Sequence, residues 1–168
     1  PRVLQPYQVI RRDVPSEPGR LATTTLTQGP MVGAHFGVNE AGLAASANNA
    51  RLWRGDHLRR RGVPFSMLIQ EILEQATSTQ AAIEIATSFP SRSNAGFIAL
   101  ADASGDAAVV EYTASSTAVR RPNDAGVLAQ ANHFSSMPHA NVPEGTRWTV
   151  KGMEHLHYLD GSRARQQA

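Results

Sequence analysis

The chain has 168 residues, of which 41% are hydrophobic and 18% charged, with a formal net charge of +2. This size and composition indicate one globular, water-soluble domain spanning residues 1–168. No apolar run approaches the length of a membrane span, so we expect a cytoplasmic protein with no membrane partner. The sequence contains no cysteine, which excludes disulfides.

The basic residues are almost all arginine, and Arg59–Arg61 form the only dense run. Nucleic-acid-binding surfaces usually combine more clustered positive charge with aromatic side chains. A solvated loop or the rim of a substrate entrance is the simpler interpretation of this run. We therefore expect no nucleic-acid partner.

The first third of the chain has the composition of a strand meander. Gln8–Arg12, the threonine-rich Leu21–Thr27, Met31–Val38 and Leu43–Asn48 are each predicted to form a strand. Gly37, Asn39 and Gly42 are residue types that tolerate a positive φ, so they predict a tight turn in the last hairpin. The small residues of 43–48 indicate that another layer or a ligand packs closely against that strand.

Two amphipathic helices are predicted next. Pro64 has the position of a first helical residue, and apolar residues then recur at helical spacing from Phe65 to Ala76. Thr77 and Gln80 have the spacing of a capping box at the start of a second helix, which ends before Pro90.

The chain then returns to strands, predicted at 96–101, 107–113, 116–120 and 127–131. A third helix is predicted from residue 146 or 147 to residue 159, followed by a frayed polar tail. Strands, helices, strands and a final helix form an α+β order, with antiparallel sheets and helices on the outer face.

The segment GVNEAGLAASANN, residues 37–49, resembles a hairpin of the penicillin acyltransferase family of N-terminal-nucleophile hydrolases. Segments 61–86, 94–114 and 126–134 resemble later parts of that family, in the same order. The resemblance implies part of a four-layer αββα sandwich, because members carry a nucleophile-bearing strand before residue 8 and further strands after residue 168. The domain would therefore be incomplete.

The implied reaction is attack on a linear amide or acyl thioester, an acyl-enzyme, and transfer to water or an amine. The family's nucleophile is a cysteine exposed by self-cleavage, and its free α-amine acts as the general base. This chain begins at Pro1 and has no cysteine, so we expect a trimmed chain whose nucleophile lies upstream or in a second chain. The alternative is a non-catalytic remnant that serves as a binding or structural module.

The resemblance assigns the oxyanion-binding side chain to Asn132, in Ala131-Asn132-His133-Phe134 after the predicted strand 127–131. A local turn hydrogen bond is the alternative role of Asn132. Asn48, Asn49 and Arg51 are candidate substrate-binding residues, with strand-end capping and a plain surface loop as the alternatives.

His133 is expected to make a structural hydrogen bond, facing away from the site. His155 and His157 lie two residues apart and do not share a helix face, so they make a poor metal pair. No ligand spacing typical of a metal site and no nucleotide-binding loop occurs, so we expect neither metal nor cofactor. An incomplete sandwich would leave sheet surface that needs cover, which favours a partner segment or a homo-oligomer.

Overall fold

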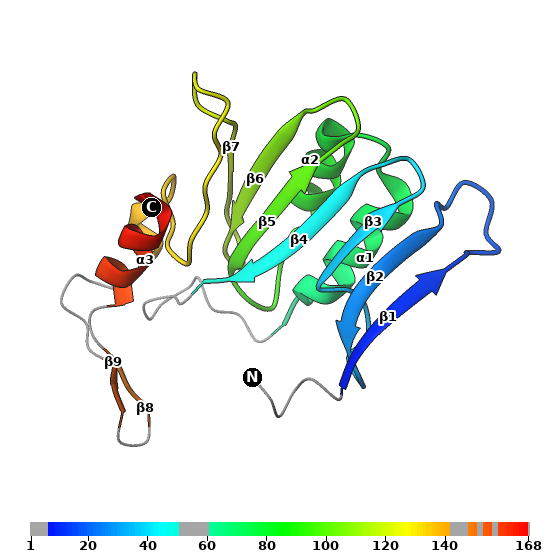
Figure 1. The fold of residues 1–168 in the computed structure, drawn as a ribbon. Coiled ribbons are helices and arrows are strands. Elements are labelled where there is room, and N and C mark those ends of the chain that lie inside the picture. The colour runs from blue at the N-terminus through cyan, green and yellow to red at the C-terminus, as the bar shows by residue number, and fades with distance from the viewer. Residues whose placement is uncertain (1–6, 51–60, 142–147, 151–152, 156–157, 168) are drawn as a thin grey trace.

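The computed structural model describes residues 7–50, 61–141, 148–150, 153–155 and 158–167, and side chains up to residue 141 and from 162 to 167. Its centre is a seven-stranded antiparallel sheet in which the strands follow one another in chain order (Figure 1). The strands are β1 (Gln8–Asp13), β2 (Thr23–Gln28), β3 (Phe36–Asn39), β4 (Ala44–Asn49), β5 (Gly96–Ala101), β6 (Ala107–Tyr112) and β7 (Thr117–Arg120).

Helices α1 (Phe65–Gln75) and α2 (Thr79–Ser88) lie together on one face of the sheet (Figure 1). Gly37 of β3 makes the close approach of α1 possible, because a Cβ at that position would lie 2.7 Å from Leu73 Cδ1. Of the two glycines predicted for the turn, Gly42 is confirmed, with φ of +84°, whereas Gly37 lies within β3. The core between sheet and helices contains Leu43, Ala45, Leu68, Ile69, Ile72, Leu73, Ala82, Ala86, Ile98, Leu100 and Val110.

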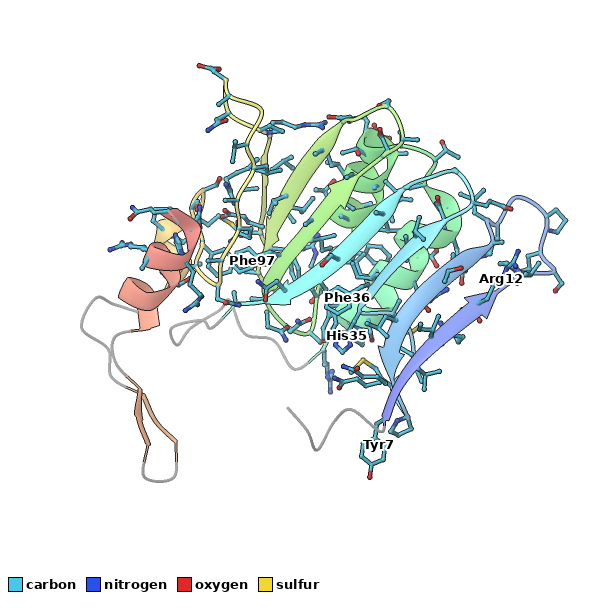
Figure 2. All side chains as sticks on the ribbon, viewed as in Figure 1. Tyr7, Arg12, His35, Phe36 and Phe97 are labelled. Atoms are coloured by element: carbon cyan, nitrogen blue, oxygen red, sulfur yellow. The ribbon has the colours of Figure 1, made fainter. Side chains whose placement is uncertain are left out.

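Among the described residues, those that cover the opposite face of the sheet gather at one end of it. There, Phe134, Met137 and Ala140 pack on Phe97 of β5 and Val109 of β6. Figure 2 shows Phe97 on the side of the sheet nearer the carboxyl-terminal helix.

Toward the β1 edge, this same face carries exposed apolar side chains. Ile10 is paired with Leu26, and Leu26 with Phe36, so the three side chains share a face. Ile10 is 77% exposed, and Phe36 and Val38 are each 43% exposed. We call Ile10, Leu26, Phe36 and Val38 the bare apolar face.

The α+β class, the antiparallel sheet and its outer helices are confirmed, as are the first two predicted helices. The predicted strand at 127–131 is wrong, because this segment has no strand geometry. Side chains bind its backbone instead: the Arg120 guanidinium Nη2 donates to the Ala129 carbonyl oxygen at 3.0 Å.

The helix predicted from residue 146 to residue 159 is also wrong. The strands β8 (Trp148–Val150) and β9 (Met153–His155) pair with each other, and α3 (Tyr158–Gln167) follows. Lys151 and Gly152 separate the two strands in sequence, and a two-residue spacer with glycine is typical of a hairpin. None of the helices within the described residues has both the length and the apolar character of a membrane span.

Candidate functional site

Three asparagines from two distant segments meet beside the end of β4. Asn132 Nδ2 donates one hydrogen bond to Asn48 Oδ1 at 2.9 Å and another to the Asn49 carbonyl oxygen at 2.8 Å. Arg165 Nη2 donates to Asn132 Oδ1 at 3.3 Å, which orients the amide with its nitrogen toward β4. Asn48 and Asn132 are 84 residues apart, so this contact is a product of the tertiary fold.

The loop that carries Asn132, residues 129–136, is bound to the sheet by the side chains of Glu111 and Arg120. The fully buried Glu111 of β6 accepts hydrogen bonds from the backbone N–H groups of Ser135 at 3.0 Å and Ser136 at 2.9 Å. Arg120 Nε donates to Glu111 Oε1 at 2.9 Å, so the buried carboxylate has a charged partner. Such pairing is what makes a buried charge tolerable.

Helix α3 binds the other side of this loop. The Ser162 hydroxyl, which is fully buried, accepts a hydrogen bond from the Asn132 backbone N–H at 2.8 Å. The same hydroxyl lies 2.9 Å from His133 Nδ1. Gln166 adds contacts with the Ala131 backbone N–H at 3.5 Å and the Ser135 hydroxyl at 3.3 Å. The loop is therefore held between the sheet and α3.

Burial, together with the positive charge of Arg163, lowers the pKa of His133 below its ordinary value. The neutral imidazole is therefore favoured at neutral pH. A neutral ring accepts or donates at Nδ1 according to its tautomer, so both tautomers are compatible with the Ser162 contact.

The structure brings Asn132, Asn48 and Asn49 together, but in a different way from the sequence-based expectation. Asn132 lies in a loop and not at a strand end, and its side chain makes long-range contacts. Asn49 contributes its carbonyl oxygen to this cluster. His133 makes a hydrogen bond with the Ser162 hydroxyl, in agreement with the structural role expected for it. Arg51 lies outside the described residues.

Sequence reasoning missed Glu111, Arg120 and Ser162 as residues that hold this loop. One signal was present: Glu111 interrupts the apolar run AAVVEY, and a carboxylate at such a position needs partners in the core. Nothing in the local sequence identifies Ser162, because its role depends on where α3 docks.

Two hollows in the described part of the chain lie away from the asparagine cluster. One of about 510 Å³ lies between β1 and α1, beside Arg11 and Gln70. The other, of about 170 Å³, lies beside Arg12 and Glu40. No group of three His, Asp or Glu side chains among the described residues is placed to hold a metal ion.

The family model described as acyl-coenzyme A:6-aminopenicillanic acid acyl-transferase matches residues 5–167. The chain belongs to this family. No curated protein matches the chain.

Three solved structures are similar to this acyl-transferase family member at low sequence identity, and the first of them, with a TM-score above 0.5, shares its fold. The N-acylethanolamine-hydrolyzing acid amidase ortholog of Caenorhabditis elegans is 15% identical, with a TM-score of 0.54 over 72% of this chain and 54% of its own. Penicillin V acylase from Agrobacterium tumefaciens is 20% identical, with a TM-score of 0.47 over 72% and 40% of the two chains. A variant of the conjugated bile acid hydrolase from Clostridium perfringens is 15% identical, with a TM-score of 0.49 over 88% and 53%. The acyl-transferase family chain thus spans about half the length of these proteins.

Proposed function

We propose that this chain supplies the oxyanion-binding and substrate-facing part of an acyltransferase or amide hydrolase that works through an acyl-enzyme. The observation that carries the proposal is the convergence of Asn132 with Asn48 and Asn49 at the end of β4. A preorganised amide N–H is a suitable donor to the negative oxygen of a tetrahedral intermediate. Family membership supports the same reaction class, since the family is named for transfer of an acyl group from a thioester to an amine.

The nucleophile in this proposal is a cysteine on a segment outside these 168 residues, exposed by self-cleavage. The sequence has no cysteine of its own, so the chain would act with that segment and would not react alone. The substrate is a small-molecule amide or acyl thioester. Asn48 would contact it, together with Arg51.

Both N–H groups of the Asn132 amide already have protein acceptors. In the proposed reaction one of them leaves its acceptor, Asn48 Oδ1 or the Asn49 carbonyl, and binds the oxyanion. The stabilisation gained in the transition state is therefore the difference in strength between a hydrogen bond to the charged oxyanion and the hydrogen bond to the neutral oxygen that it replaces.

The decisive test is Asn132→Ala in the protein that includes the nucleophile-bearing segment, with a chromogenic N-acyl anilide as substrate. Acyl-enzyme formation, followed by intact mass spectrometry after rapid quenching, is expected to slow by about 100- to 1,000-fold. Asn123→Ala changes an exposed turn asparagine and is the matched control. Acylation of Asn132→Ala at the unmodified rate would contradict the role of Asn132.

A binding module without catalysis is the second candidate, favoured by the absence of cysteine and by the occupied donors of Asn132. It predicts that the same substrates bind with no acyl adduct in the mass spectrum of the protein that includes the upstream segment. An adduct on that segment would exclude the binding module.

A further inference from the structure

The side chain of Gln130 brackets Asn132 on both sides. Its Nε2 donates to the Ala131 carbonyl oxygen at 3.1 Å and to the His133 carbonyl oxygen at 2.8 Å. These are the carbonyls of the residues immediately before and after Asn132. One amide group therefore fixes the backbone from which the Asn132 side chain projects.

Gln130 is itself held by Arg120. The Arg120 Nη2 atom donates to Gln130 Oε1, and its Nε donates to the buried Glu111 carboxylate. The arginine side chain is only 20% exposed, and it also binds the Ala129 carbonyl. Glu111, Arg120 and Gln130 thus form one connected chain of hydrogen bonds from the buried Glu111 carboxylate to the carbonyl oxygens on either side of Asn132.

Only a side-chain amide satisfies this position. Arg120 binds the amide oxygen, and both flanking carbonyl oxygens accept from the same amide nitrogen. The Ala131 carbonyl oxygen also accepts from Asn48 Nδ2 at 3.4 Å, so the His133 carbonyl oxygen depends most on this donor. A carboxylate of the same length supplies the acceptor and loses both donors, and a hydrocarbon side chain supplies neither.

We propose that Gln130, oriented by Arg120 and Glu111, is a positioning residue that sets the direction of the Asn132 amide toward the substrate. The inference rests on the proposed oxyanion role of Asn132 for its effect on rate. Its structural part, the dependence of Asn132 on Gln130, is separate and is measured without any substrate.

The test compares Gln130→Glu with Gln80→Glu, in the protein that includes the nucleophile-bearing segment. Gln80 is a close match on the exposed surface of α2, because its Oε1 accepts from Arg121 at 3.1 Å and its Nε2 donates to Glu84 at 3.1 Å. Both variants exchange an amide for a carboxylate beside an arginine.

Two measurements are made on each variant. The first is the position and exchange rate of the Asn132 Nδ2 proton signals by NMR, assigned with the Asn132→Ala protein. The second is steady-state kinetics with an N-acyl anilide. Gln130→Glu is expected to shift the Asn132 signals and to lower kcat by about 10- to 100-fold. KM should stay within about twofold, because the oxyanion exists only after attack. Gln80→Glu should change neither.

Unchanged Asn132 signals in Gln130→Glu would overturn the positioning role, whatever the rate. If Asn132→Ala itself acylates normally, the oxyanion proposal fails, and the NMR comparison still decides whether Gln130 orients Asn132. Should the introduced carboxylate prevent folding, Gln130→Met removes the same two donors without adding charge and receives the same two measurements.

Discussion

Asn39 uses both ends of its buried side chain to join the hairpin turn to a helix. Its Oδ1 accepts from the backbone N–H groups of Ala41 at 3.1 Å and Leu43 at 3.0 Å. Its Nδ2 donates to the carbonyl oxygens of Leu73 at 2.9 Å and Ala76 at 2.7 Å, where α1 ends. The turn role of Asn39 could be predicted from the sequence. The helix contact could not, because Leu73 and Ala76 follow Asn39 by 34 and 37 positions in the chain and meet it only through tertiary packing.

Asn39→Asp should lower the free energy of unfolding by about 3 kcal/mol. The carboxylate keeps the acceptor for the turn and loses the donor to two carbonyls, which costs about 1–3 kcal/mol for each unsatisfied buried group. Asn123 makes the same turn bonds, with Ala125 and Val127, on an exposed loop. Asn123→Asp should therefore change stability by less than about 0.5 kcal/mol. Urea unfolding at neutral pH measures both, and equal losses would refute the explanation.

Two histidines should make the fold less stable in mild acid. Burial lowers the pKa of His35 and of His133 below the ordinary value, so the unfolded chain binds protons more readily than the folded one. The free energy of unfolding is then highest above about pH 6.5 and decreases as the pH falls below it.

Urea unfolding across this range checks the sign. The double variant His35→Gln, His133→Gln should lose most of the decrease between about pH 6.5 and 5. A decrease of the same size in the double variant would show that other groups cause it.

At the scale of one element, the sequence pattern places the start of α2 within one residue of its position in the structure but selects the wrong N-cap residue. Thr77 with Gln80 predicted the cap, but Ser78 is the N-cap, and its hydroxyl accepts from the Ala81 backbone N–H at 3.2 Å. Asp102 also binds the Thr79 N–H at 2.7 Å, a contact from the β5–β6 hairpin that fixes where the helix begins. That long-range contact is invisible in the local pattern.

Ser78→Ala should destabilise the protein by about 1 kcal/mol, the usual cost of losing an N-cap. Thr77→Ala, at the exposed neighbouring residue, should have no measurable effect on the unfolding midpoint. Thermal unfolding of the two variants distinguishes the assignments, and a larger effect at Thr77 would restore the predicted capping box.

Two segments that sequence reasoning misassigned have backbone or side-chain contacts that the local sequence does not show. Residues 127–131 are apolar enough for a strand, yet the Arg120 and Gln130 side chains bind the Ala129 and Ala131 carbonyl oxygens that a neighbouring strand would pair. The polar tail expected to fray lies in α3, because Ser162 and Gln166 bind the Asn132 loop. In both cases the deciding contacts join β7 or α3 to residues in another part of the chain.

On the scale of the whole molecule, one sheet face is packed on helices, and the described residues that cover the other face lie near the asparagine cluster. The helix-facing side was predictable, since the apolar stripes of α1 and α2 require a sheet. The family resemblance implies a second sheet on the other side, and the bare apolar face lies where such a layer would pack. A contiguous exposed apolar surface of this kind is typical of an interface.

The isolated 168-residue chain should therefore self-associate through the bare apolar face, and Ile10→Thr with Val38→Thr should reduce this association. Threonine keeps the β-branched shape that a strand favours, so the sheet itself should remain folded. Val119→Thr is the control. It makes the same change on an exposed valine of β7 that lies on the other face of the sheet, since its strand partner Val110 belongs to the helix-facing core.

Light scattering of the unmodified chain, the double variant and the control, with binding of an apolar dye, tests the expectation. Equal association in all three would show that another surface is responsible. If the protein that includes the upstream segment binds no dye and is insensitive to the Ile10 and Val38 changes, these residues are covered by that segment, as a two-sheet sandwich requires.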